Sequence, residues 1–217
     1  WKLHKLRASS WLMTLRTEDM DGDGDLDILA SDRKGKNSKV LWLENPGPKA
    51  NRNQKSWVEH TVGAHGREVM FIDFTDLNGD GRKDAIVPCR PREILILYQP
   101  EKLDQHWEEQ VLTFPSEKYG TAKGVRVADL DKDGKLDIAV TCEHANGHLS
   151  GCFYLSYQNS TRDRFWKDTD IGGPLGTKYD RIELLDVDGD GDLDLFSCEE
   201  RDQLGVFWYE NPSVSNF

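Results

Sequence analysis

The sequence contains too little cysteine, and too little continuous apolar sequence, for two common classes of protein. Four cysteines in 217 residues are too few for a disulfide scaffold and do not fix the redox compartment. No apolar run approaches the roughly 20 residues of a membrane-spanning helix, so we expect no membrane insertion. Lys and Arg number 28 against 39 Asp and Glu, a formal net charge of -11. Because nucleic-acid binding needs a basic surface, this charge excludes a general nucleic-acid partner.

Helical periodicity and the common catalytic motifs are also lacking. The chain shows no nucleophile elbow, phosphate-binding loop, dinucleotide fingerprint or zinc-protease motif. The hydrophobic fraction of 37%, with 10% aromatic residues, nevertheless predicts a folded domain with a real core.

Acidic residues concentrate in four segments that share the pattern D-x-[DN]-x-D-G-x-x-D. The segments are residues 19–27, 76–84, 129–137 and 186–194, so they recur every 53 to 57 residues. Carboxylates this close in a tight turn repel one another unless a cation lies among them. Ca²⁺ takes six to eight oxygen ligands, whereas Mg²⁺ prefers to keep its waters. The alternative is four acidic surface turns without an ion.

We therefore predict about four Ca²⁺ sites, one for each acidic segment. Positions 1, 3, 5 and 9 of each loop offer side-chain oxygens, position 7 can offer its carbonyl, and Gly at position 6 permits a sharp bend. The predicted ligands are Asp19, Asp21, Asp23, Asp25 and Asp27; Asp76, Asn78, Asp80, Arg82 and Asp84; Asp129, Asp131, Asp133, Lys135 and Asp137; and Asp186, Asp188, Asp190, Asp192 and Asp194.

The second half of each loop differs from an EF-hand. An EF-hand has a bidentate Glu at position 12, but this position holds Ala30, Val87, Val140 and Ser197. Apolar, β-prone runs follow the loops, so each site is expected between two strands.

Each loop belongs to a longer repeat of four expected strands. One strand precedes the loop, a second follows it, and a third is aromatic, as in residues 40–46 and 206–212. The fourth begins with a Trp, at Trp1, Trp57, Trp107 and Trp166. Four short strands in each unit, separated by turns, are typical of a propeller blade.

These loops, set between short strands and followed by aromatic strands, resemble those of FG-GAP/VCBS repeat proteins over essentially the whole chain. The resemblance implies an all-β fold, a Ca²⁺-loaded β-propeller like those of integrin α heads, fungal lectins, several polysaccharide lyases and many secreted bacterial proteins. It also implies an extracellular or periplasmic location. It implies fold and metal more strongly than function.

The strand order predicts one propeller domain over residues 1–217, with four four-stranded blades. Residues 1–7 would supply the missing outer strand of the last blade and close the ring, the usual closing device in the propellers that the chain resembles. The alternative is a fragment of a larger propeller. Three residues before the loops lie Arg16, Asp73, Arg126 and Glu183, whose alternating signs predict a ring of ion pairs lining the central channel.

The loops on the face opposite the predicted metal sites mix Arg, carboxylate, His and aromatic residues. Sugars favour this mixture, because rings stack on C–H faces while Arg and carboxylates bond hydroxyls. The candidate ligand-binding residues are Trp11, Arg67, Arg92, Glu143, His144, Tyr179, Arg181 and Glu199. Any single one of these charges can instead be solvated or paired with a neighbour.

Three functions are compatible with this pattern. The first is a monomeric, non-catalytic recognition module that binds a glycan or a protein partner through the opposite face, which the lack of catalytic motifs favours. The second, implied by the resemblance, is a polysaccharide lyase acting on uronic-acid glycans, with His65 or His144, Tyr119 or Tyr179, and an Arg as candidates. The third is a structural scaffold of a larger secreted protein.

The cysteines suggest one crosslink. Cys142 and Cys152 flank one predicted hairpin and could form a disulfide. Cys89 and Cys198 belong to opposite blades and should not pair.

Overall fold

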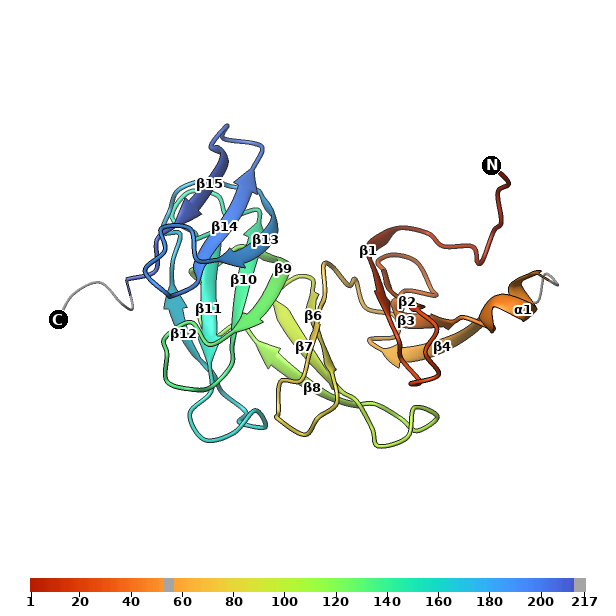
Figure 1. Cartoon of the computed structure of the whole chain (residues 1–217). Coiled ribbons are helices and arrows are strands. Elements are labelled where there is room, and N and C mark those ends of the chain that lie inside the picture. Colours follow the sequence, from red (N-terminus) through yellow and green to blue (C-terminus); the bar gives the residue numbers. More distant parts are fainter. Residues whose placement is uncertain (53–56, 213–217) are drawn as a thin grey trace.

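Short strands form where β-branched and aromatic runs follow the acidic turns, and in the computed structural model they assemble into four antiparallel sheets arranged as a β-propeller (Figure 1). Residues 1–52 and 57–212 are described. Blade 1 contains β1 (Leu12–Glu18), β2 (Asp27–Asp32), β3 (Lys39–Glu44) and β4 (Val58–Gly63). Blade 2 contains β5 (Asp73–Thr75), β6 (Asp84–Cys89), β7 (Glu93–Tyr98) and β8 (Glu108–Thr113). Blade 3 contains β9 (Thr121–Ala128), β10 (Asp137–Glu143), β11 (Cys152–Ser156) and β12 (Lys167–Asp170). Blade 4 contains β13 (Tyr179–Leu185), β14 (Asp194–Glu199) and β15 (Gly205–Tyr209).

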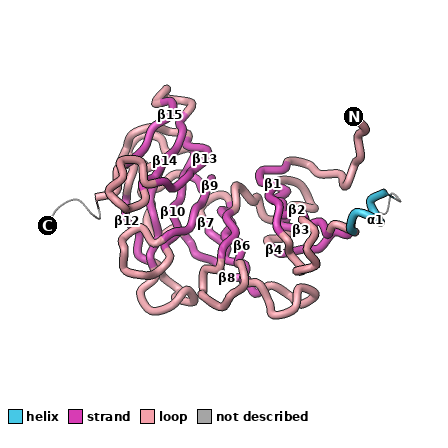
Figure 2. The backbone as a smooth tube through the Cα atoms, in the orientation of Figure 1, coloured by secondary structure: helices cyan, strands magenta, loops and turns pink. Residues whose placement is uncertain are grey.

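The predicted all-β class is confirmed, with one short exception. A six-residue helix, α1 (Gly47–Arg52), follows β3, and Figure 2 shows it beside a structure otherwise made of strands and loops. A helix this short has too few turns to display a periodic pattern in the sequence.

The predicted closure of the ring by residues 1–7 is wrong for this structure. Blade 4 has only the three strands β13, β14 and β15, and residues 1–11 contain no strand. The Arg7 side chain instead binds blade 1, with Nη1 3.0 Å from Asp32 Oδ2 and Nε 2.8 Å from Glu59 Oε2. These ion pairs hold the first segment on blade 1, and the N-terminal end lies across the molecule from β15 (Figure 1).

The core lies between successive blades, because alternate side chains of each strand face opposite neighbours. In blade 2, Ala85 and Val87 pack toward blade 1, while Ile86 packs toward blade 3. The Trp that precedes the outer strand of blade 2 or blade 3 faces the preceding blade: Trp107 is buried with blade 1, and Trp166 is buried with blade 2. The interfaces between blades therefore carry most of the apolar burial.

All four cysteines are free thiols, so the possible Cys142–Cys152 disulfide is not formed. Cys142 and Cys152 are completely buried, and burial raises the pKa of both thiols. They act as small apolar side chains in the core.

We predict that Trp107→Ala destabilises the protein by about 3–5 kcal/mol, because it removes a buried indole and leaves a cavity between blades 1 and 2. The measurement is the free energy of unfolding in urea. Phe165→Ala is the control, since this ring is 79% exposed and its loss should cost less than about 0.5 kcal/mol. Similar losses for the two variants would contradict this account of the core.

Candidate functional sites

The acidic loops are shaped by hydrogen bonds from their own backbone. In the first loop, Asp19 Oδ1 accepts the N–H of Gly22 at 2.8 Å, and Asp19 Oδ2 accepts that of Gly24 at 3.1 Å. Gly22 and Gly24 have φ angles of 78° and 90°, a region that favours glycine. In the third loop Lys132 takes the first of these positions with φ 57°. The first carboxylate of the loop thus stabilises the turn by accepting backbone N–H groups from it.

The last aspartate of each loop is buried and connects three parts of its blade. Asp27 Oδ2 accepts the N–H of Met20 at 2.9 Å, and Asp27 Oδ1 accepts that of Asn45, just after β3, at 2.8 Å. The equivalent bonds recur at Asp84 and Asp194. Each of these residues joins the loop, the second strand and the end of the third strand.

Burial makes a negative charge at this position unfavourable. It raises the pKa of Asp84 to about 6, despite the bonds from the Gln99 and Leu77 N–H groups, and it raises that of Asp137 to about 6. Nearby Asp76 and Asp80 raise the pKa of Asp84 further. A cation among these carboxylates would relieve both the burial cost and the repulsion.

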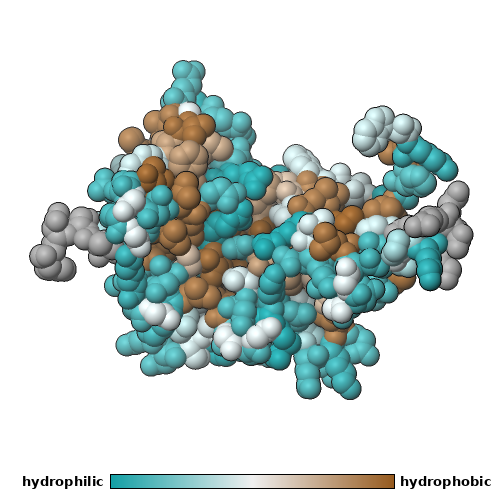
Figure 3. Space-filling model, viewed as in Figure 1, coloured by the Kyte–Doolittle hydropathy of each residue, from teal (hydrophilic) through white to brown (hydrophobic). Residues whose placement is uncertain are grey.

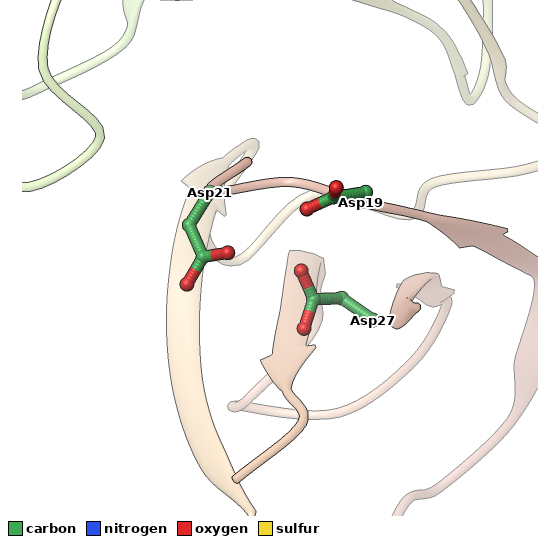
Figure 4. Close-up of side chains that lie close together, drawn as sticks. All are labelled: Asp19, Asp21 and Asp27. Carbon is green, nitrogen blue, oxygen red and sulfur yellow. The ribbon is translucent and has the colours of Figure 1, made fainter. Parts of the chain in front are cut away.

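Three of the loops bring the carboxylates of positions 1, 3 and 9 together, with oxygens within 4.8 Å of one another. Figure 4 shows the first group, in which the three carboxylates turn toward one shared space. The groups are Asp19, Asp21 and Asp27; Asp129, Asp131 and Asp137; and Asp186, Asp188 and Asp194. Such groups could hold a metal ion.

The second loop departs from the other three at position 3. Asn78 stands there, so Asp76 and Asp84 lack a third carboxylate at that place, and an amide oxygen takes it. A cation of the second loop would therefore meet less negative charge.

The predicted ligands at positions 5 and 7 lie outside these groups. Asp23 Oδ1 accepts the N–H of Asp25, and Asp190 does the same for Asp192. In the second and third loops the position 5 carboxylates form ion pairs with the position 7 side chains, Arg82–Asp80 and Lys135–Asp133. The side chains at position 5 thus bind the backbone of the loop.

A buried oxygen supports a cation in the third loop. Asp129 Oδ1 is buried and has no hydrogen-bond partner. A buried carboxylate oxygen is costly without a partner, so an ion at this place fits the donor set.

Sequence reasoning missed the residues that donate to the buried aspartate from the third strand. These are the backbone N–H groups of Asn45, Gln99 and Asn211. The available signal was the dipeptide that recurs there, Asn45-Pro46, Gln99-Pro100 and Asn211-Pro212.

On the opposite face, a chain of ion pairs crosses all four blades. Arg33 of blade 1 contacts Glu68 at 2.6 Å, and Glu68 contacts Arg90 of blade 2 at 3.2 Å. Glu143, buried at the end of β10, contacts Arg90 at 3.2 Å and Lys123 at 3.0 Å. Lys123 also contacts Asp180 of blade 4 at 3.0 Å. We call this series the cross-blade ion-pair chain.

The predicted ligand residues fall into separate places. His144 is exposed and lies 3.3 Å from Arg90, which places it beside Glu143 on the cross-blade ion-pair chain. Arg67 pairs with Glu93, and Arg92 donates to the carbonyl oxygens of Tyr119 and Ser116. The structure therefore does not gather the eight residues into one pocket.

Tyr179 and Glu199 are buried, and their hydrogen bonds stabilise the loops of blade 4. The Tyr179 hydroxyl donates to the Leu175 carbonyl and lies 3.0 Å from the Tyr209 hydroxyl. Glu199 accepts backbone N–H groups from Thr177, Lys178, Arg201, Asp202 and Leu204. Burial raises the pKa of the Tyr179 phenol and of the Tyr119 phenol, which donates to Asp168 at 2.5 Å. Neither phenol is placed as an acid or base for a lyase.

Trp11 and Arg181 remain accessible. The Trp11 ring is 50% exposed, with Arg33 4.7 Å and Lys34 4.8 Å from its centroid. Beside it lies a cavity of about 320 Å³ lined by Arg7, Ala8, Ser9, Ser10, Asp32, Lys34, Gly35, Lys36 and Asn37. An exposed ring with cations and hydroxyls beside it can bind a sugar that carries an acidic group.

The central channel contains two of the expected ion pairs. Arg16 contacts Asp73 at 3.3 Å, and Arg126 contacts Glu183 at 2.8 Å. Arg16, Arg126 and Arg181 line a cavity of about 210 Å³, together with residues of the innermost segments of all four blades. Each of these ion pairs joins two neighbouring blades: the first joins blade 1 to blade 2, and the second joins blade 3 to blade 4.

We predict that Glu199→Gln lowers stability at pH 7 by about 1–3 kcal/mol, because the buried N–H groups lose a charged acceptor. Burial favours the protonated carboxyl, but the bonds from Asp202, Arg201, Lys178 and Leu204 outweigh it and lower the pKa below its usual 4.5. The stabilisation is therefore complete above about pH 4.5 and is lost as the pH falls through the lower folded-state pKa.

The measurement is urea unfolding between pH 7 and pH 3, with the exposed neighbour Glu200→Gln as the control. The gap between wild type and Glu199→Gln should shrink below pH 4.5, and the control should stay near wild type. A gap that is constant with pH would contradict a charged Glu199.

A family model described as FG-GAP-like repeat matches residues 9–87, which include blade 1, the first two acidic loops and part of blade 2. No curated protein matches the chain. No helix in the described residues is long and apolar enough to cross a membrane. Residues 9–87 thus carry an FG-GAP-like repeat, in a chain whose four sheets are arranged as a β-propeller.

Proposed function

We propose that this protein is a Ca²⁺-stabilised, secreted recognition module that binds a glycan through the face opposite the acidic loops. The observation that carries the metal is the repeated grouping of three carboxylates, with the buried and unpartnered Asp129 Oδ1 in the third loop. Ca²⁺ suits a site built from carboxylate and carbonyl oxygens in a flexible loop. Bound there, it would neutralise the repulsion among the carboxylates and hold the turn closed.

The protein's own residues transmit this stabilisation to the blade. Asp27 and its equivalents already join the loop to the second and third strands through backbone N–H groups. A loop held closed therefore fixes the register of these two strands. The rigid blade then positions the loops at its other end, where recognition loops on a scaffold are expected.

The proposed glycan contact is Trp11 with Arg33 and Lys34. The half-exposed ring offers a surface for the C–H face of a sugar, and the cations beside it favour a carboxylate or sulfate on that sugar. His144, exposed beside the cross-blade ion-pair chain, and Arg181 are further accessible polar groups on the propeller. A protein partner on the same face is the other outcome that the experiment below can give.

We predict that saturating Ca²⁺ raises the melting temperature and that EDTA lowers it. A ligand at 100 times its dissociation constant adds about 2.7 kcal/mol per site, and each kcal/mol is worth roughly 2–4 °C in a domain of this size. Asp129→Asn combined with Asp131→Asn should remove one site's share of the increase. Differential scanning calorimetry with and without Ca²⁺ measures both effects.

The control is Asp104→Asn, an exposed carboxylate outside the four loops. It should keep the full response to Ca²⁺. A melting temperature that is the same in Ca²⁺ and in EDTA would falsify the metal assignment.

We predict that Trp11→Ala weakens binding to an acidic glycan at least tenfold, because it removes the proposed stacking surface. The measurement is a glycan array followed by calorimetry with the best uronate or sulfated ligand. Val111→Ala, a partly exposed residue of β8, is the control and should bind normally. Binding of a protein from a defined panel, with no glycan bound, would replace the glycan by a protein partner. No ligand of either kind would argue for a scaffold.

A further inference from the structure

Two of the interfaces between blades contain a slot filled by the Trp that precedes an outer strand. Trp107, before β8, lies in the core cluster between blades 1 and 2 and is 1% exposed. Trp166, before β12, lies between blades 2 and 3 and is 4% exposed. The indole Nε1 of both residues has no hydrogen-bond partner. Packing alone therefore holds the rings in these slots.

A cavity of about 300 Å³ occupies the equivalent place between blades 3 and 4. Several residues that line this cavity occupy the same positions in their blades as residues around Trp166. Leu130 stands in its loop where Leu77 stands, and Leu195 takes the ladder position of Ile138. Tyr154 and Ile171 take the ladder positions of Ile96 and Leu112. The place filled by Trp166 in one interface is thus an open slot in the next, beside β15, with which no fourth strand of blade 4 pairs in the described structure.

Blade 1 shows what kind of strand pairs with a sequence like that of β15. Its third strand presents Trp42 and Glu44 to His60 of β4. The Trp42 and His60 rings stack at 4.2 Å, and His60 Nε2 lies 2.7 Å from Glu44 Oε2. Residues 206–212 repeat this strand as Val-Phe-Trp-Tyr-Glu-Asn-Pro, so Trp208 and Glu210 correspond to Trp42 and Glu44.

The matching outer strand has Trp followed by His three residues later. In the 217 residues this pattern occurs twice, at Trp57 with His60 and at Trp1 with His4. In blades 2 and 3 the third strand lacks this Trp and the outer strand lacks this His. Ile96 faces Gln110 in blade 2, and Tyr154 faces Thr169 in blade 3. The pairing that blade 1 displays therefore has one remaining counterpart, between residues 1–4 and β15.

We propose that the slot beside β15 binds residues 1–6 of a second copy of this chain, with Trp1 in the slot and His4 against Trp208 and Glu210. A chain's own residues 1–6 lie across the molecule from its β15, because Arg7 is bound to Asp32 and Glu59 of blade 1 (Figure 1). Trp1 is fully exposed and Leu3 is 94% exposed. A second copy supplies this strand without any change in blade 1.

Reciprocal exchange between two copies also covers the exposed ends of the open propeller. Leu15 on blade 1 is 66% exposed, and Leu185 and Val206 on blade 4 are 57% and 69% exposed. Figure 3 shows apolar surface over blade 1 and over the region of β15. A two-fold arrangement brings each blade 4 against the partner's blade 1. This proposed dimer differs from the monomer that the sequence predicts.

The test is a crosslink whose position is set by blade 1. Val58, one residue after its Trp, pairs with Glu44, so Lys2 of one copy should lie opposite Glu210 of the other. Paired residues on adjacent strands lie at a separation that a disulfide can bridge. In a Cys198→Ser background, chains with Lys2→Cys are mixed with chains with Glu210→Cys and oxidised. A crosslinked heterodimer with this single bond is the expected result.

Three outcomes decide the proposal. Crosslinking between the two singly substituted chains, with a dimer in sedimentation equilibrium of the unsubstituted protein, supports it. A chain carrying both substitutions that crosslinks only within a monomer overturns the second copy and assigns the strand to the same chain. A monomer without either crosslink overturns the slot itself.

Variants of Trp1 separate binding in the slot from a general loss of stability. Trp1→Ala should weaken dimerisation at least tenfold, while Trp1→Phe should retain most of it, because the buried indoles of the filled slots make no hydrogen bond through Nε1. Phe165→Ala is the control for an exposed ring outside the slot. Equal dimerisation of Trp1→Ala and wild type would contradict an indole in the slot.

Discussion

Each blade depends on one buried aspartate at the end of its acidic loop. Both oxygens of Asp27 accept backbone N–H groups, one from the loop and one from the residue after the third strand. The same two bonds at Asp84 and Asp194 make this a repeated element of the fold. Because the group is a carboxylate in a buried place, its charge is costly, and the remaining carboxylates of the loop raise that cost. The structural role of the aspartate and the demand for a cation thus come from the same atoms.

The two ends of a blade differ in how their charged residues are arranged. At the loop end, negative charge is concentrated and local in sequence, since positions 1, 3 and 9 belong to one turn. At the opposite end, charge is balanced between residues far apart in the chain, as where Glu143 meets Arg90 and Lys123. The net charge of -11 therefore says little about the proposed recognition face, where cations and carboxylates are already paired. A ligand there must compete with these pairs or use what they leave accessible, which is Trp11 above all.

The sequence predicts what is local and repeated, and does not predict the partners of residues whose surroundings differ from blade to blade. The four loops, the strands around them and the aromatic third strands are readable because each spans a few residues and occurs four times. The contacts of Glu143 and Glu199 cannot be predicted in this way, although each residue follows a Cys at the end of the second strand of its blade. One meets Arg90 of the preceding blade, and the other is enclosed by backbone N–H groups of its own turn. The sequence pattern predicts a loop at Tyr179, but this residue begins β13 and is completely buried.

Ring closure is a further feature that the sequence predicts only in part. A Trp followed by His three residues later identifies the outer strand that suits a Trp-x-Glu third strand, and blade 1 displays that pairing in full. The pattern specifies which strand belongs beside β15, because stacking and the His–Glu contact act between neighbouring residues. It does not specify which molecule supplies the strand. That choice depends on where Arg7 holds the segment, and the two contacts of Arg7 with blade 1 direct residues 1–6 away from the blade whose edge they match.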